Sequence, residues 1–181
     1  EGAYDLVVAN PPYHSVTKLA ADATSYQRLY DLGRADLFAA FILRSLELLR
    51  PGGFTASVTL SNWMFLKAFS DFRAHLLEGY RLVALGDLGK GSFSSGSNLI
   101  SASTQVFQKS EATGTSIALR PYDAGDVSTD TGRIDRNVAA LTCHVGRHEF
   151  DPAALKVVPE WPLVYWWGEE DINLYQSAPL V

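Results

Sequence analysis

The stretch YDLVVANPPY, residues 4–13, decides the fold. Residues 4–9 form a short apolar run rich in β-branched side chains, which predicts a central strand covered on both faces. Asn10, two prolines and Tyr13 follow this strand directly. The carboxyl edge of an open α/β sheet is the place where such folds bind ligands, so these residues are candidates for a site.

Strands and helices alternate along the chain after this stretch. The run LFAAFILRSLELLR after Asp36 has apolar residues at helical spacing, and Pro51-Gly52-Gly53 predicts where that helix stops. Residues 14–35 are mixed and polar, which favours a long loop. We expect a second helix over 70–78 and further strands over 54–60, 80–88 and 100–108.

This order of elements predicts a fold class. Strands that alternate with crossover helices form a parallel sheet, and the last two strands, joined by a loop of about ten residues, predict an antiparallel pair at its edge. We therefore expect residues 1–110 to form the second half of a doubly wound, Rossmann-like α/β sheet. Residues 111–181 change in composition, and we interpret them as a linker and the start of a further domain.

Composition narrows the class of protein. The chain has 181 residues, 47% of them hydrophobic, which is enough for one sizeable core. Cys143 is the single cysteine, so no internal disulfide can form. No apolar run approaches the roughly 18 residues of a membrane span. We therefore expect a cytoplasmic location and no membrane contact.

The net charge of −5 gives no electrostatic sign of a nucleic-acid partner. The chain starts at Glu1, within the approach to a strand, and we expect a piece of a longer protein.

The residues at 10–13 suit the recognition of a planar amino group. Proline has no backbone N–H, so the prolines leave carbonyl oxygens such as that of Pro11 available to accept a hydrogen bond. The Asn10 amide oxygen is a second acceptor, and Tyr13 offers an aromatic face. An ordinary turn is the alternative, but this tetrapeptide should occur by chance in only about one such chain in a thousand.

Asn-Pro-Pro-Tyr after an apolar strand resembles the catalytic motif of S-adenosylmethionine-dependent amino methyltransferases. The resemblance implies that Asn10, beside the cofactor, and the Pro11 carbonyl hydrogen-bond the target nitrogen. It also implies that Pro12 shapes the turn and that Tyr13 stacks on a flipped base. The implied reaction is a direct in-line methyl transfer from S-adenosylmethionine, in which positioning supplies most of the rate and no covalent enzyme intermediate forms.

Two other segments resemble the gamma class of DNA adenine-N6 methyltransferases. Residues 36–53 resemble a helix of that class whose aromatic residue lines the cofactor's adenine pocket; that residue is Phe41, with a plain core position as the alternative. Residues 86–95 resemble its loop with a second base-stacking aromatic residue, which is Phe93. Tyr13 and Phe93 would then sandwich the flipped adenine, and each stacking contact of this kind contributes about 1–3 kcal/mol.

The gamma class places its glycine-rich cofactor loop upstream of the motif. No such strand-loop-helix follows residue 13, and Gly89-x-Gly91 lacks a capped helix after it. The resemblance thus implies a cofactor-binding half outside this chain, so the chain alone should bind S-adenosylmethionine poorly. Residues 150–175 are similar to the junction with the target-recognition domain in type IIG restriction enzymes and PglX-like enzymes of BREX phage-defence systems. This implies double-stranded DNA with a flipped adenine as substrate and other defence-system subunits as partners.

Several alternatives remain open. A glutamine amide in a protein and the guanine amino group in RNA also present a planar NH2, and a catalytically idle DNA-recognition subunit would keep the same fold. Cys143, His144 and His148 form an incomplete metal pattern, and no metal is expected. Basic residues of the polar loop are further candidates for phosphate contacts, namely Lys18, Arg28 and Arg34.

Overall fold

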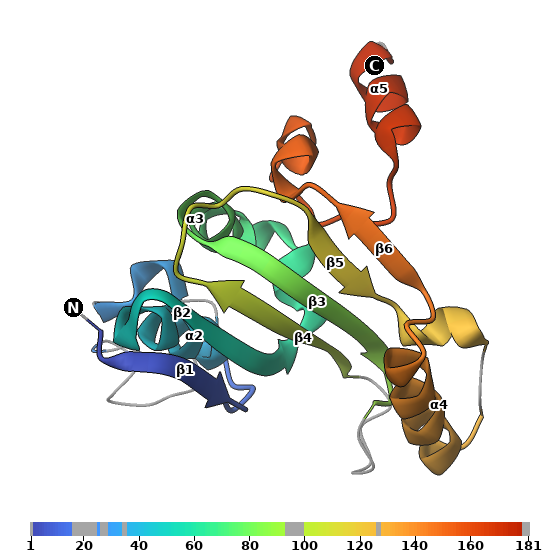
Figure 1. The fold of residues 1–181 in the computed structure, drawn as a ribbon, viewed down its shortest axis with the longest axis horizontal. Helices are drawn as coiled ribbons and strands as arrows, with labels where there is room; N and C mark the ends of the chain where they lie inside the picture. The colour runs from blue at the N-terminus through green and yellow to red at the C-terminus, as the bar shows by residue number, and fades with distance from the viewer. Residues whose placement is uncertain are drawn as a thin grey trace.

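The computed structural model describes residues 2–15, 25, 29–33, 36–92, 100–125 and 128–178. Within these residues, six strands form one mixed sheet in the order β1-β2-β4-β3-β5-β6 (Figure 1). The strands are β1 (Tyr4–Ala9), β2 (Leu49–Leu60), β3 (Arg81–Lys90), β4 (Ser101–Gln108), β5 (Ser116–Leu119) and β6 (Arg147–Phe150). The α-helices are α2 (Leu37–Leu48), α3 (Ser70–Gly79), α4 (Asp130–Thr142) and α5 (Glu169–Ser177). Short 3-10 helices connect them: η2 (Asp31–Gly33), η3 (Ser61–Met64), η4 (Lys67–Phe69), η5 (Pro121–Ala124) and η6 (Pro152–Val157).

Four strands run in the same direction and end at one edge of the sheet. β1 pairs with β2 and β3 pairs with β5 in parallel, whereas β4 is antiparallel to both β2 and β3. The arrowheads of β1, β2, β3 and β5 therefore point the same way in Figure 1. This carboxyl edge is where ligands of open α/β sheets bind.

The predicted antiparallel pair is confirmed as β3 and β4, but its predicted place at the edge of the sheet is wrong. β4 lies between β2 and β3, so both of its hydrogen-bonding sides are used, and β5 and β6 extend the sheet beyond β3. The physical reason is that a loop of about ten residues lets the returning strand enter the gap beside β3 instead of adding outside it.

The strand β1 has the predicted bounds but not the predicted central position. It is an edge strand that pairs only with β2 among the described strands, with Leu6 opposite Phe54 and Ala9 opposite Ser57. Leu6 is 59% exposed and Val8 is 71% exposed, so the apolar run is not covered on both faces here. An unpaired apolar edge of this kind is a surface on which a further strand can add.

Local sequence signals explain helix α2. The Asp36 carboxylate accepts a hydrogen bond from the Phe38 backbone N–H at 3.3 Å, as an N-cap residue does. The Leu37 backbone N–H, one of the donors that a helix start leaves without an intrahelical partner, donates to the carbonyl of His14 at 3.0 Å. The start of the helix is thereby tied to the segment that follows β1.

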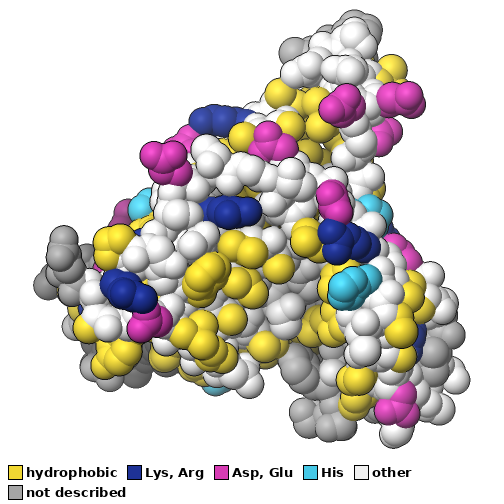
Figure 2. All heavy atoms as spheres, viewed as in Figure 1, with side chains coloured by type: hydrophobic (Ala, Val, Ile, Leu, Met, Phe, Trp, Pro, Cys, Tyr) yellow, Lys and Arg dark blue, Asp and Glu magenta, His cyan; other side chains and the backbone are white. Residues whose placement is uncertain are grey.

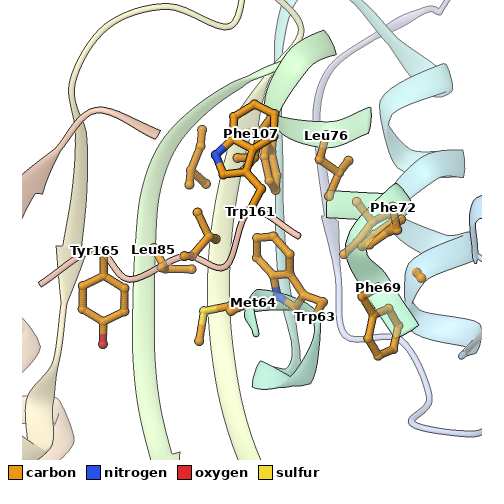
Figure 3. Close-up of a cluster of buried hydrophobic side chains, with 14 of the residues drawn as sticks. Trp63, Met64, Phe69, Phe72, Leu76, Leu85, Phe107, Trp161 and Tyr165 are labelled. Atoms are coloured by element: carbon orange, nitrogen blue, oxygen red, sulfur yellow. The ribbon is translucent and has the colours of Figure 1, made fainter. Parts of the chain in front are cut away.

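The core lies between the sheet and the helices α2 and α3. Burial alternates over residues 53–60 of β2 and 103–108 of β4, where odd-numbered residues are buried and even-numbered residues are at least partly exposed, as expected for a sheet with one face more covered than the other. Figure 3 shows the aromatic centre of this core, where the Trp63 ring lies 6.4 Å from that of Phe72 and 6.1 Å from that of Phe107. Figure 2 shows hydrophobic side chains at the surface over the strands.

The core continues into the C-terminal part of the chain. Trp161, Leu163 and Tyr165 are buried in the same cluster, and the Leu163 backbone N–H donates to the Met64 carbonyl at 2.9 Å. Helix α5 buries no side chain and projects away from the sheet in Figure 1. The assignment of 111–181 to a linker and the start of a target-recognition region stays a prediction.

A buried arginine joins these parts. The Arg73 side chain on α3 is 0% exposed, and its guanidinium donates to four backbone carbonyls. Two of these belong to Trp63 (2.6 Å) and Leu66 (3.2 Å), and the other two to Glu160 (2.5 Å) and Trp161 (2.7 Å). Burial lowers the pKa of Arg73 to about 10, so the side chain stays charged at neutral pH. Arg73 thus links the segment after β2 to the C-terminal segment through hydrogen bonds.

None of the helices in the described part of the chain has the length and apolarity to cross a bilayer.

Candidate active site

The carboxyl edge of the sheet gathers the candidate residues. Asn10 to Tyr13 follow β1, η3 follows β2, Gly91 and Ser92 follow β3, and η5 follows β5. These connections meet at one edge because their strands are parallel. The predicted placement of Asn10 to Tyr13 at this edge is what the structure shows.

The Asn10–Tyr13 segment combines an exposed amide with a partly buried ring. Asn10 and Pro12 are exposed, Pro11 is buried and Tyr13 is half-buried. The Tyr13 hydroxyl has two acceptors at long hydrogen-bond distance, Asn10 Oδ1 at 3.4 Å and the Val58 carbonyl at 3.5 Å, which share its single hydrogen. Burial raises the pKa of Tyr13, so it stays a neutral donor. The ring is therefore held against β2 while the Asn10 amide faces solvent.

Of the two other aromatic residues predicted for the site, the structure describes Phe41. Phe41, on α2, is 41% exposed, whereas Phe38 on the same helix is fully buried. Phe41 is not among the buried residues of the core cluster, so the core alternative is not confirmed, and its role toward a cofactor stays a prediction. Phe93 lies outside the described residues.

The predicted phosphate contacts at Lys18, Arg28 and Arg34 also lie outside the described residues, so they stay predictions.

The glycines of residues 86–91 serve close packing at the exit of β3. Gly89 and Gly91 both have a φ of +70°, which favours glycine. A Cβ atom on Gly89 would lie 2.9 Å from the Tyr122 ring, and one on Gly91 would lie 2.5 Å from Nε of Arg133. This packing explains Gly89-x-Gly91 without a cofactor role, since the glycines let β3 approach η5 and α4.

A buried polar cluster that sequence reasoning missed lies behind this exit. The Asp87 carboxylate, on β3, accepts hydrogen bonds from the hydroxyls of Tyr122 (2.9 Å) and Tyr165 (2.8 Å). Burial, with a contribution from the Asp87 charge, raises the pKa of Tyr122 to about 12 and that of Tyr165 further. An aspartate inside an otherwise apolar strand was the signal that could have indicated it.

The residues of the incomplete metal pattern do not come together around a site. Cys143 is exposed, and His148 Nε2 lies 3.6 Å from a carboxylate oxygen of Asp123. Within the ranges that the structure describes, no group of three or more His, Cys, Asp or Glu side chains could hold a metal ion.

Comparison with known sequences gives two informative relatives. The chain is 27% identical over 179 residues to adenine-specific methyltransferase BrxX from Escherichia coli O9:H4 (strain HS), an alignment that covers 97% of this chain and 14% of that protein. It is 28% identical over 113 residues to adenine-specific methyltransferase PglX from Lacticaseibacillus casei (strain Zhang), covering 61% of this chain and 9% of that protein. The chain therefore spans a small part of the length of these relatives.

Comparison with solved structures agrees at the level of the fold. A nuclease-deletion mutant of the Type ISP restriction-modification enzyme LlaGI, solved in complex with a DNA substrate mimic, matches with a TM-score of 0.65 and 14% sequence identity. The match covers 93% of this chain and 18% of that chain. The family model described as Eco57I restriction-modification methylase matches residues 1–93. Since that match covers more than half of the 181 residues, the chain belongs to the Eco57I restriction-modification methylase family.

Proposed function

We propose that this chain is the acceptor-binding part of a DNA adenine-N6 methyltransferase and that Asn10 to Tyr13 receive the adenine amino group. The observation that carries the proposal is the position of this tetrapeptide at the carboxyl end of a parallel strand, with the Asn10 amide exposed and the Tyr13 ring held against β2. The family is a methylase family, and both relatives above are named adenine-specific methyltransferases.

The roles of the chain's own residues follow from their chemistry. Asn10 Oδ1 and the Pro11 carbonyl accept the two hydrogens of the amino group, which turns the nitrogen lone pair toward the methyl donor. The same acceptors stabilise the positive charge that develops on the nitrogen as it bonds to the methyl carbon. Pro12 keeps the turn rigid, and Tyr13 stacks on the base. The 3.4 Å contact between the Tyr13 hydroxyl and Asn10 Oδ1 is long enough to yield to the incoming amino group.

The family and the fold imply S-adenosylmethionine as the methyl donor. It supplies an electrophilic methyl group on a sulfonium centre. The exposed Phe41 ring fits a role against the cofactor's adenine, because an aromatic side chain outside the core is free to stack. We place the remaining cofactor contacts elsewhere in the full-length protein, on segments that pair with the open edge of β1.

The adenine assignment competes with two other amino acceptors and with an inactive role. A protein glutamine or an RNA guanine would present the same planar NH2, but the names of the relatives favour adenine, and the restriction-modification family favours DNA. The intact Asn10–Tyr13 segment argues against a catalytically idle recognition subunit. We further propose that the full-length protein works in the cytoplasm within a restriction or phage-defence system, on double-stranded DNA with a flipped adenine, together with other subunits.

The test compares two asparagine substitutions in the full-length protein. Asn10→Ala should lower methyl incorporation into duplex DNA by about 10²-fold or more, the loss typical of one removed charge-stabilising contact. Asn173→Ala, at an exposed position on α5, is the matched control and should retain activity. Parallel reactions on protein and RNA separate the rival acceptors. Full activity of Asn10→Ala, or methylation of protein or RNA in place of DNA, would refute the proposal.

A further inference from the structure

A basic groove opens at the same carboxyl edge as the acceptor segment, by which we mean Asn10 to Tyr13. It has a volume of about 330 Å³ and is lined by Gly89, Lys90, Ser101, Tyr122, Arg133 and Arg136. These residues come from the end of β3, the start of β4, η5 and α4, and Figure 1 shows α4 beside the carboxyl end of β3. Within the described part of the chain, no acidic side chain lines it. The positive charge is therefore local, in a chain whose net charge is −5.

The guanidinium of Arg136 is held in place before any ligand arrives. Its Nη1 donates to the Gly125 carbonyl at 2.9 Å, and its Nε and Nη2 donate to Asn137 Oδ1 at 3.2 and 2.9 Å. Asn137 in turn donates to the Leu88 carbonyl of β3 at 3.4 Å. These acceptors are neutral oxygens, so the contacts orient the charge without cancelling it.

The neighbouring Arg133 is positioned in a similar way. Its Nη1 donates to the Ser128 carbonyl at 3.1 Å, and its side chain packs on Gly91, where a Cβ atom would lie 2.5 Å from Nε. Lys90 is exposed at the rim of the groove. The groove thus combines the exposed ammonium of Lys90 with the oriented guanidinium of Arg136, and both kinds of cation bind phosphate oxygens well.

We infer that this groove binds the phosphate backbone of the DNA strand a few nucleotides away from the flipped adenine. The inference rests on the proposed function. The end of β3 is three strands from the end of β1 in the sheet, about 14 Å across the strands at roughly 4.8 Å per strand. Ala9 is level with Leu85 through Ser57 and Gln105, so Lys90 also lies about 16 Å further along the strand direction at roughly 3.3 Å per residue. The combined separation of about 20 Å corresponds to about six base-pair steps of 3.4 Å. Backbone contacts here would fix the register of the strand relative to Asn10 to Tyr13.

The occupant is a backbone phosphate of duplex DNA. The groove is open to solvent, and Tyr122 is the only aromatic residue in its described lining, so it does not enclose a free nucleotide between walls. Charged contacts of this kind carry no sequence information and act by fixing register. Loss of the Lys90 or the Arg136 contact should therefore weaken binding to all duplex sequences equally.

The experiment measures duplex binding by the full-length protein at a series of salt concentrations. Lys90→Gln and Arg136→Gln should each reduce the slope of log K against log salt by about 0.9, for specific and nonspecific duplexes alike. The affinity deficit of each variant should thus be about 3- to 4-fold larger at 50 mM salt than at 200 mM. Lys156→Gln is the matched control, because Lys156 pairs with Glu78 near the opposite end of β3 and should keep the wild-type slope.

The outcomes separate this inference from the proposed function. If Lys90→Gln and Arg136→Gln keep the wild-type slope while Asn10→Ala still loses methylation, the inference that the groove binds backbone phosphate is refuted and the proposed function stands. Reduced slopes in both variants would support phosphate binding in the groove even if Asn10→Ala kept its activity. Loss of inorganic phosphate binding with unchanged duplex slopes would assign the groove to free phosphate and overturn the inference. Unchanged melting temperatures check that both variants remain folded.

Discussion

We expect the buried guanidinium of Arg73 to contribute more than any other single side chain to holding the C-terminal segment against the rest of the domain. Replacing it with Met keeps most of the side-chain volume but removes every hydrogen bond to the four carbonyls. Exchanging buried charges for apolar groups is often harmless when both partners are replaced. Here the partners are backbone carbonyls that cannot be removed, so they are left without donors.

The magnitude follows from where those carbonyls lie. The bonds to Trp63 and Trp161 are buried, and each acceptor left unsatisfied costs about 1–3 kcal/mol. The bonds to Leu66 and Glu160 are partly buried, so water can replace the donor there. Glu160 and Trp161 also have φ values of 66° and 52°, a strained backbone that Arg73 holds. We expect a total loss of about 3–5 kcal/mol, against which the relief of burying a charge is a smaller gain.

Hydrogen exchange of the full-length protein measures this loss locally. A loss of about 3–5 kcal/mol corresponds to roughly 150- to 4,000-fold faster exchange in peptides that span residues 160–165, with the Leu163 amide as reporter. Arg73→Lys should lie between, because an ammonium reaches fewer of the carbonyls. Arg44→Met, at an exposed position on α2, is the matched control and should leave exchange unchanged. Exchange in Arg73→Met within about threefold of wild type would refute the reasoning.

Two other perturbations test the exit of β3. Gly91→Ala should destabilise the protein by about 1–2 kcal/mol, because the φ of Gly91 is +70° and the new Cβ atom would collide with the Arg133 guanidinium. The control is Gly79→Ala, at an unobstructed helix end, which should be neutral or slightly stabilising. Equal melting temperatures for the two variants would contradict this prediction. The pKa of Tyr122 is raised to about 12, so the folded state holds its proton longer than the unfolded chain, whose tyrosines ionise near pH 10. The stability from the Tyr122 contact with Asp87 should therefore be complete below about pH 10 and lost as the pH rises toward 12; Tyr122→Phe should show a shallower fall of melting temperature over this window, and an identical fall would count against the cluster.

Much of the local structure could be predicted because its causes lie close together in the chain. The bounds of β1 match the apolar run at 4–9, and α3 covers the helix expected at 70–78. Asp36 caps α2 as predicted, although that helix ends at Leu48, before Pro51, because β2 begins at once at Leu49. Periodicity and capping act over a few residues, so a single sequence reveals them.

The order of the strands could not be predicted in the same way. The position of β4 between β2 and β3, and of β1 at the edge, depends on hydrogen bonds between segments up to about fifty residues apart. Neither position changes the local pattern of a strand. An apolar run therefore indicates a strand without stating how many neighbours it has.

The sequence by itself determined the place of the proposed acceptor residues, since Asn10, Pro11, Pro12 and Tyr13 are consecutive and the strand before them sets their place at the carboxyl edge. Only the tertiary structure decided which distant side chains join that edge. Lys90 and Arg136 are 46 residues apart in the chain yet line one groove. The physical reason is that such groups meet through strand pairing and packing, which no pattern along the chain records.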